Sequence, residues 1–317
     1  MDNMLSRLLS SFGVSGHENE VRKTIIEELK DIECDIKEDK MGNLIVKIGE
    51  GKEKMMLCAH MDELGLIATF IEDNGFIRVG SIGDFNTAEV VHNLVTFENG
   101  VVGKVGAVKS NPEIGDLFID IGVKTREEAL TKVKEGYVAS FLGDAVEIDD
   151  KIISPGLDNR VGCYVLLRFI KEVKETNKEL YFVFSSQAEL GGRGARAASY
   201  AIAPDYCIVV DLEEAGDIPG GKNNIKLGAG PIITVMDRSL IMHHEIKEML
   251  EKAAKEKEIQ VQYAAVNRIS DGGTIHKEGI GVKTGVLSIP CRYNHTISEM
   301  VCAEDIEKTV EVLKGLL

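Results

Sequence analysis

Apolar residues recur in turn with helical and strand-like spacing along most of the chain. Val21, Ile25 and Leu29 fall on one face of a helix within 15–33, and Ser15 and Glu18 have capping-box spacing at its start. Further helices are predicted in 159–175, 194–203, 244–258 and 303–317, and strands in 43–49, 54–60, 180–186, 206–212, 231–236, 259–266 and 282–289. This alternation predicts an α/β fold, an open mixed sheet covered by helices on both faces.

The segment 66–152 has a different pattern. It is rich in Val, Ile and Gly, and it contains short strand-like stretches at 66–73, 75–80, 93–108 and 144–150, with turns at Asn74-Gly75 and Asn99-Gly100. We therefore predict a small β-barrel-like domain, 66–152, inserted into an α/β domain that is formed by 1–65 and 153–317.

The charge balance limits the classes of partner. Lys and Arg number 37 and Asp and Glu 52, which gives a net charge of −15, and such a field repels nucleic acid and anionic lipid. No charge-free run approaches the ~18 residues of a membrane helix, and the first residues lack the basic and continuous apolar regions of a signal peptide. The six cysteines are scattered without a CxxC motif and are expected to be reduced. These features predict a cytoplasmic protein with no nucleic-acid or membrane partner.

Histidine and carboxylate residues lie where several of the predicted strands end. They are His60 and Asp62, Glu189, Asp211 and His295, together with Asp158 at the start of a helix. Any one of them alone is more often a cap or a turn residue, but the carboxyl ends of strands in an open α/β sheet meet at one edge. Clustered carboxylates repel one another unless a cation neutralises them, and two imidazoles with three carboxylates suit zinc, cobalt or manganese. Asp62 is placed to hold the other ring nitrogen of His60.

Distinctive sequence motifs are distributed over nearly the whole chain. They are "FGVSGHENEVR", "CAHMDELG", "DLFIDIG", "GLDNRVGC", "SSQAELGGRGA", "PDYCIVVDLEEAGDIPG" and "RYNHTISEM". Their combination resembles the cytosolic dinuclear-metal aminopeptidases, a family that includes glutamyl, deblocking and tetrahedral (TET) aminopeptidases, some labelled endoglucanases. The resemblance implies a phosphorylase/hydrolase-like peptidase domain in which Asp158 bridges two metals. It makes His60 and Asp211 the other ligands of one metal, Glu189 and His295 those of the second, and Asp62 the catalytic residue that orients the histidine.

Residue 188 departs from the family's pattern. The family has two adjacent glutamates here, the first a general base and the second a ligand, whereas "SSQAELGG" has Ala188 followed by Glu189. A methyl group cannot accept a proton, so the chain is either a variant made to disable turnover or a natural member without the usual base. Asn159, where many members have a second aspartate, is a lesser departure. Asp271 resembles part of a Thr-Asp motif near the site and is a candidate for substrate binding, although a turn residue would look the same.

Three functions remain open on the sequence. The resemblance favours a metallo-aminopeptidase that removes N-terminal residues from short peptides with two divalent ions, zinc, cobalt or manganese, and that is impaired at Ala188. The alternative is a non-hydrolytic metal-binding relative of the same fold. Endoglucanase activity rests only on labels within the family, since the chain has no Trp and no evident pair of acid and nucleophile carboxylates. The family also forms dimers through the inserted domain and tetrahedral dodecamers, so self-association is expected.

Overall fold

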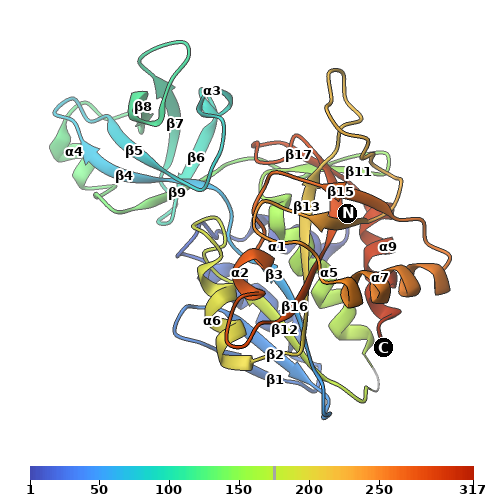
Figure 1. The fold of residues 1–317 in the computed structure, drawn as a ribbon. Coiled ribbons are helices and arrows are strands. Elements are labelled where there is room, and N and C mark those ends of the chain that lie inside the picture. Colours follow the sequence, from blue (N-terminus) through green and yellow to red (C-terminus); the bar gives the residue numbers. More distant parts are fainter. Residues whose placement is uncertain (174–175) are drawn as a thin grey trace.

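The chain forms an α/β body from which a smaller β-barrel projects, as Figure 1 shows. This computed structural model describes residues 1–173 and 176–317. Its helices are α1 (Asn3–Ser10), α2 (Asn19–Leu29), α3 (Thr87–Val90), α4 (Arg126–Leu130), α5 (Leu157–Glu172), α6 (Arg193–Ile202), α7 (His244–Glu256), α8 (Gly272–Ile275) and α9 (Ala303–Lys314), with a 3-10 turn at Ile114–Asp116. Its first nine strands are β1 (Asp35–Glu38), β2 (Leu44–Ile48), β3 (Lys54–His60), β4 (Gly65–Ile71), β5 (Ile77–Ile82), β6 (Leu94–Phe97), β7 (Val102–Ala107), β8 (Leu117–Asp120) and β9 (Val138–Phe141). The others are β10 (Val146–Ile148), β11 (Lys151–Ser154), β12 (Glu179–Ser185), β13 (Tyr206–Glu214), β14 (Ile232–Met236), β15 (Gln262–Ala265), β16 (Lys283–Arg292) and β17 (Glu299–Cys302).

The body is built on one mixed sheet of 11 strands. Its centre is parallel, in the order β12-β3-β13-β16, and antiparallel strands flank this centre on both sides. Side chains of β3 alternate between two cores: Leu57 belongs to a core that includes residues of α1, α2, α5, α7 and α9, and Met56 belongs to one that includes residues of α6 and α8. The predicted α/β sheet with helices on both faces is therefore confirmed.

The inserted segment closes into a six-stranded barrel, in the order β4-β5-β8-β7-β6-β9. Its own core contains Leu66, Ile77, Val95, Phe97 and Ile119, all almost fully buried. The prediction of a β-barrel-like domain is confirmed, but the last strand-like stretch predicted for it does not belong to the barrel. The stretch 144–150 contributes β10, which pairs with β11 in the large sheet, because its exposed side chains offer the barrel core nothing to bury.

Two local predictions need correction. The capping box at the start of α2 is wrong, because the helix begins at Asn19 and its N-cap residue Glu18 makes no side-chain cap. The Ser15 hydroxyl instead donates to Asp62, 2.5 Å away, since it lies before the helix and faces the body of the protein. The helix predicted in 159–175 is α5, which ends at Glu172; the last two predicted residues, 174 and 175, lie outside the described residues.

A fully buried arginine ties the N-terminal segment to the body. Arg160 Nη1 donates to the carbonyl oxygens of Leu8 and Ser11 at 2.7 and 2.8 Å, and Nε donates to that of Met61 at 2.7 Å. Its charge is balanced by Glu63, whose Oε1 lies 3.3 Å from Nη2. One side chain therefore holds α1, the end of β3 and the start of α5 in fixed positions.

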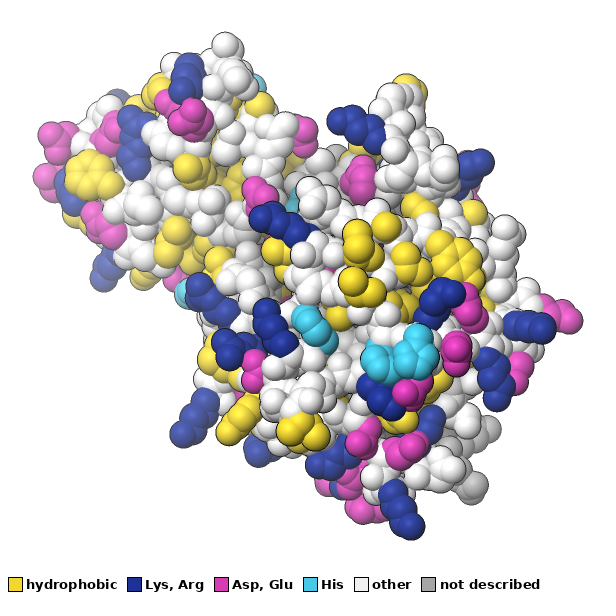
Figure 2. Space-filling view, in the orientation of Figure 1, with side chains coloured by type: hydrophobic (Ala, Val, Ile, Leu, Met, Phe, Trp, Pro, Cys, Tyr) yellow, Lys and Arg dark blue, Asp and Glu magenta, His cyan; other side chains and the backbone are white. Residues whose placement is uncertain are grey.

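The surface shows mixed charge, and the helices are short. On the face in Figure 2, Lys and Arg side chains are interspersed with Asp and Glu over both the barrel and the body. Among the residues that the structure describes, none of the helices has the length and apolar character that crossing a bilayer requires.

Candidate metal centre and active site

The predicted ligands gather at the carboxyl edge of the parallel strands. His60 is the last residue of β3, Glu189 follows β12 and His295 follows β16. Asp211 lies within β13, which continues to Glu214 rather than ending at the aspartate, and Asp158 lies at the start of α5. Because these strands are parallel neighbours, the side chains meet although they are far apart in sequence.

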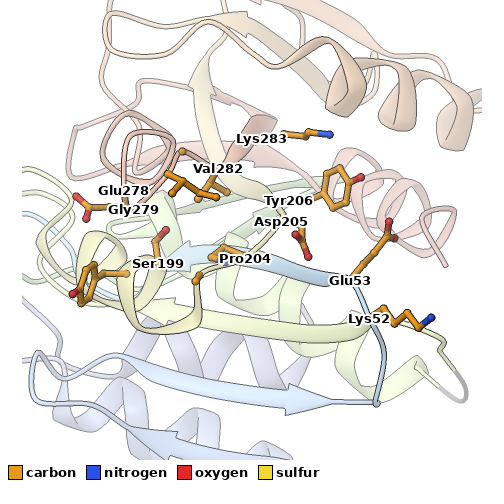
Figure 3. A pocket seen from close by; sticks show the side chains of 14 residues that line it. Lys52, Glu53, Ser199, Pro204, Asp205, Tyr206, Glu278, Gly279, Val282 and Lys283 are labelled. Atoms are coloured by element: carbon orange, nitrogen blue, oxygen red, sulfur yellow. The ribbon is translucent and has the colours of Figure 1, made fainter.

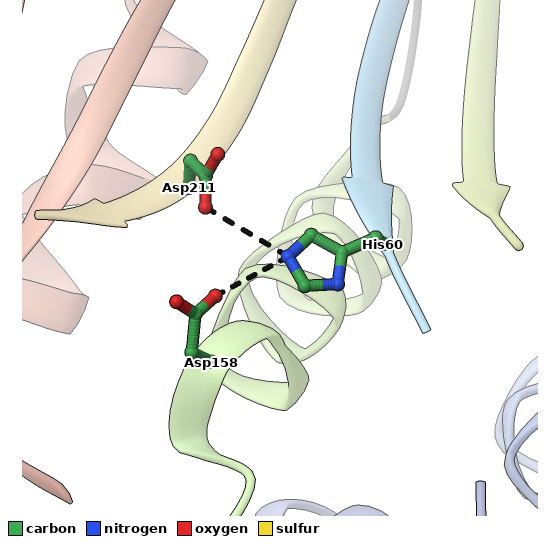
Figure 4. A group of neighbouring side chains, drawn as sticks. All are labelled: His60, Asp158 and Asp211. Carbon is green, nitrogen blue, oxygen red and sulfur yellow. Dashed lines mark ion pairs between the residues drawn. The ribbon is translucent and has the colours of Figure 1, made fainter. Parts of the chain in front are cut away.

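The first group of ligand-type residues is His60, Asp158 and Asp211, shown in Figure 4. His60 Nε2 lies 3.2 Å from Asp158 Oδ1 and 3.9 Å from Asp211 Oδ1. All three residues are buried, and within the described part of the chain Asp158 Oδ1 has no hydrogen-bond partner. An orphaned carboxylate oxygen that faces an imidazole and a second carboxylate fits a divalent cation.

The second group shares Asp158 with the first. His295 Nε2 lies 3.4 Å from Asp158 Oδ2 and 3.6 Å from Glu189 Oε1. The two oxygens of Asp158 thus face different groups, Oδ1 the first and Oδ2 the second. In each group, one donor atom from every member lies within 4.8 Å of the others.

Both histidines are oriented through their Nδ1 atoms. His60 Nδ1 lies 3.0 Å from the carbonyl oxygen of Asp62, and His295 Nδ1 lies 2.8 Å from that of Asp84. A carbonyl oxygen can only accept, so each ring donates from Nδ1, and in the neutral ring the lone pair of Nε2 faces the carboxylates. The Asp62 carboxylate, which was expected to hold the His60 ring, is farther from Nδ1, at 3.7 Å.

The crowding of acidic groups changes their protonation. Burial and the charge of Asp158 raise the pKa of Asp211 to about 7, and burial raises the pKa of Glu189. Burial also disfavours the charged forms of His60 and Asp158. Hydrogen bonding from His295 and then His60 nevertheless holds the pKa of Asp158 well below its ordinary value, and the hydrogen bond to Asp158 holds the pKa of His60 well above its own. A divalent cation would relieve the repulsion among these carboxylates.

Ala188 and Asp271 line a cavity of about 40 Å³ beside the first group, with His60, Glu189 and Asp211 in its wall. The Asp62 carboxylate holds the backbone here, since its Oδ1 accepts from Ala188 N at 2.9 Å and its Oδ2 accepts from Glu189 N at 3.0 Å. Asp271 is buried and accepts a hydrogen bond from Ser185 Oγ at 2.7 Å. Residue 188 is thus held in the wall of the cavity that His60, Glu189 and Asp211 also line.

The structure adds Glu299 to the site, a residue that the sequence analysis missed. Glu299 Oε1 accepts from His295 N and Oε2 accepts from Asp158 N, both at 2.9 Å. Burial and the charge of Asp158 raise its pKa to about 8. His295 has φ of 61°, in the left-handed region, and this hydrogen bond helps to hold it there. The only sequence signal was its place in "RYNHTISEM", four residues after His295.

Arg268 was also missed. Its Nη2 lies 2.8 Å from His295 Nε2 and 3.1 Å from Asp158 Oδ2. Arg268 lies in the loop between β15 and α8, where no periodicity or strand end marked it.

The barrel reaches the site through the loop after β5, which contains Asp84. A Cβ added to the neighbouring Gly83 would lie 2.3 Å from Leu64 Cδ2 and 3.2 Å from Glu189 Oε2, and φ there is +81°. Only glycine fits this conformation and this close approach. The barrel is therefore packed against the second group and not only tethered to the body.

Asn159 makes use of its amide. Its Nδ2 donates to the carbonyl oxygen of Val210 at 2.8 Å, and its Oδ1 accepts from Gly162 N at 2.9 Å. An ionised aspartate could not donate to Val210. The amide therefore joins the start of α5 to β13, next to Asp211.

A larger cavity, of about 390 Å³, lies at the opposite edge of the sheet (Figure 3). Its wall includes Tyr206 and Lys283, the first residues of β13 and β16, and Tyr200 of α6. It is separated from the ligand groups by the length of these strands, so it takes no part in their chemistry.

Comparisons with known proteins show which family the chain belongs to. A family model described as M42 glutamyl aminopeptidase matches residues 42–312. A putative aminopeptidase of Acetivibrio thermocellus is 44% identical, over 99% of this chain and 97% of the relative. The solved Pyrococcus horikoshii TET1 peptidase, which can assemble into a tetrahedron or a large octahedral shell, is 31% identical with a TM-score of 0.91, over 99% of this chain and 98% of that one. A Thermotoga maritima structure named endoglucanase is 29% identical with a TM-score of 0.84, over 98% of this chain and 96% of that one. With a family match over residues 42–312 and a relative 44% identical over 99% of its length, the chain belongs to the M42 glutamyl aminopeptidase family.

Proposed function

We propose that the chain is a metal-dependent aminopeptidase for short peptides, with its turnover impaired at Ala188. The observation that carries this proposal is Asp158, whose two carboxylate oxygens face two separate groups of ligands. Two divalent ions, zinc or cobalt and otherwise manganese, would polarise the peptide carbonyl and activate the attacking water. His60 and Asp211 would hold one ion and Glu189 and His295 the other, with Asp158 between them.

The chain's own residues would position the groups of the active site, but the general base that would carry the proton is missing at position 188. Asp62 fixes the backbone of 188 and 189. The methyl group of Ala188 cannot take a proton from water or pass it to the leaving amine. Asp271, in the wall of the same cavity, is a candidate contact for the substrate. The alternative, a non-hydrolytic metal-binding relative, predicts no turnover even when glutamate is restored at 188.

Metal analysis tests the two-ion site. After saturation with zinc or cobalt and mild dialysis, we expect two ions per chain. Asp211→Asn should retain one ion, because Asp211 faces only the first group, whereas Asp158→Asn should weaken both. Inductively coupled plasma mass spectrometry gives the stoichiometry. Less than one ion per chain in the unsubstituted protein would sink the dinuclear site.

The class of substrate distinguishes a peptidase from an endoglucanase, the activity that only the names of some relatives suggest. Release of N-terminal amino acids from short peptides, against release of reducing sugar from cellulose, distinguishes the two in parallel assays with metal present. We expect only the peptide reaction, at a low rate, and its loss on adding a chelator. Sugar release that exceeds peptide hydrolysis would overturn the proposal.

We also propose that the inserted domain, 66–152, which contains the barrel, mediates dimerisation. The dimers would in turn build a tetrahedral dodecamer. Phe70, Leu94, Val102 and Val108 are exposed apolar side chains of this segment, and such residues gain by being covered in an interface. The assembly named for the TET1 relative supports the proposal.

Light scattering tests the assembly. We expect a multiple of the 34.7 kDa chain mass, and a shift towards monomer when Phe70 and Leu94 are both changed to lysine. Ile36→Lys, on the edge strand β1 at the far end of the body, is the control and should leave the mass unchanged. A monomer with metal present would refute self-association.

The cysteines bear on location. All six are free thiols, and five of them are buried. Disulfides are rare in the reducing cytosol, so we propose a cytoplasmic location.

A further inference from the structure

The guanidinium of Arg268 lies against His295 Nε2, the atom through which this candidate ligand would coordinate a metal ion. Its Nη2 is 2.8 Å from His295 Nε2, the nitrogen that faces Glu189 and Asp158. The same Nη2 donates to Asp158 Oδ2 at 3.1 Å. Two of the three residues in the second group are therefore engaged by one guanidinium nitrogen.

The chemistry of the imidazole allows one partner at a time. His295 donates from Nδ1 to the Asp84 carbonyl, so in the neutral ring Nε2 carries the single lone pair, in the plane of the ring. A guanidinium remains protonated in proteins and can only donate. Where Arg268 donates to that lone pair, His295 cannot coordinate an ion.

Arg268 also supplies positive charge to the cluster. Asp158, Asp211, Glu213 and Glu189 are the carboxylates that act on its guanidinium most strongly. Its Nη1 is buried and, among the described residues, has no hydrogen-bond partner, so this end of the side chain is not fixed by further contacts. The first group differs, because within the described residues Arg268 makes no hydrogen bond or ion pair with His60 or Asp211.

We propose that Arg268 is an internal competitor for the second divalent cation: its guanidinium occupies His295 Nε2 and Asp158 Oδ2 until an ion displaces it. This inference rests on the proposed two-ion site. It makes the two positions unequal, with the group of His60, Asp158 and Asp211 filled first and the group of Asp158, Glu189 and His295 filled at higher ion concentration. The side chain thereby sets the cation concentration at which the centre is complete.

Calorimetric titration with Co²⁺ alone tests the proposal, on metal-free protein and on Arg268→Met. Methionine keeps an unbranched side chain but removes the charge and the donors. We expect the dissociation constant of the second ion to fall by about tenfold or more, the order expected when a hydrogen bond from a charged donor no longer has to be broken. The first ion should change by a smaller factor, since Arg268 touches only Asp158 in that group. Arg238→Met is the matched control, because Arg238 is exposed and the substitution removes the same unit of charge outside the ligand groups.

A second measurement covers the case in which Arg268→Met does not fold. Crystal structures of the unsubstituted protein, with chelator and with saturating Co²⁺, should show Arg268 Nη2 on His295 Nε2 only when the second ion is absent. Equal second-ion affinity in Arg268→Met and the unsubstituted protein would overturn the proposal, and so would an ion on His295 with Nη2 still at hydrogen-bond distance. Failure of every protein to bind any ion would instead reject the two-metal function itself.

Discussion

Glutamate at position 188 should raise kcat for the release of N-terminal residues from short peptides by ~10²-fold or more, the lower part of the range for general acid–base assistance. Ala188 lies in the wall of the cavity with His60, Glu189 and Asp211, and its backbone is fixed by Asp62. A carboxylate there could take the proton of the attacking water and deliver it to the leaving amine. Metal affinity should change less, because Glu189 stays in place. The measurement is kcat on a panel of peptides with zinc, cobalt and manganese in turn.

Two further variants isolate the proton transfer. Ala188→Gln matches the size and polarity of glutamate but cannot act as a base at neutral pH, so it should remain as slow as the unsubstituted protein. Ala201→Glu adds the same charge at an exposed position near the end of α6 and should have no effect. Equal rates for Ala188→Glu and Ala188→Gln would mean that another residue carries the proton and that residue 188 is not the family's base position.

The largest expected loss of stability follows removal of the buried Arg160 side chain. Arg160→Met should lower the free energy of unfolding by ~3–5 kcal/mol, the range for breaking a buried ion pair from one side. The Glu63 carboxylate would be left buried without its cationic partner, and the carbonyl groups of Leu8, Ser11 and Met61 would each lose the hydrogen bond that Arg160 donates. Urea unfolding at one fixed protein concentration, with chelator present, measures the change without a contribution from bound ions.

A surface arginine provides the comparison for that loss. Arg7 pairs with Glu28 at 2.6 Å, but its side chain is 41% exposed, so Arg7→Met should cost about 1 kcal/mol or less. A loss of similar size for the two variants would show that the buried network contributes no more than an exposed ion pair.

The sequence predicted those parts of the site that depend on regular elements. His60, Glu189 and His295 could be found because each follows an apolar strand, and parallel strands bring their ends to one edge. Arg268 and Glu299 could not be found in this way, since their roles depend on where a loop and the short strand β17 pack in three dimensions. The same limit applies to Ser15. Its spacing to Glu18 matches a capping box, but its hydroxyl donates to Asp62, which is distant in sequence.

For the fold, too, the regular elements could be predicted from the sequence, but not all of the strand pairing. Alternating apolar runs identified the sheet, its helices and a separate β-rich insertion. They did not show that β10 leaves the barrel and joins the large sheet, because strand pairing is decided by partners that are distant in sequence. Asn159 illustrates the reverse case: the sequence resemblance made it a departure from the expected pattern, yet its amide makes two hydrogen bonds that explain its presence.

The position of the barrel within the chain has a consequence for biosynthesis. β3, the apolar strand that ends in His60, pairs with β12 and β13, and both are translated after the whole barrel. The barrel is one continuous stretch with its own core, so it can be completed on the ribosome while β3 still lacks both neighbours. The nascent chain therefore carries an unpaired hydrophobic strand past a finished domain, and His60 first meets Glu189 and His295 only after the barrel is complete.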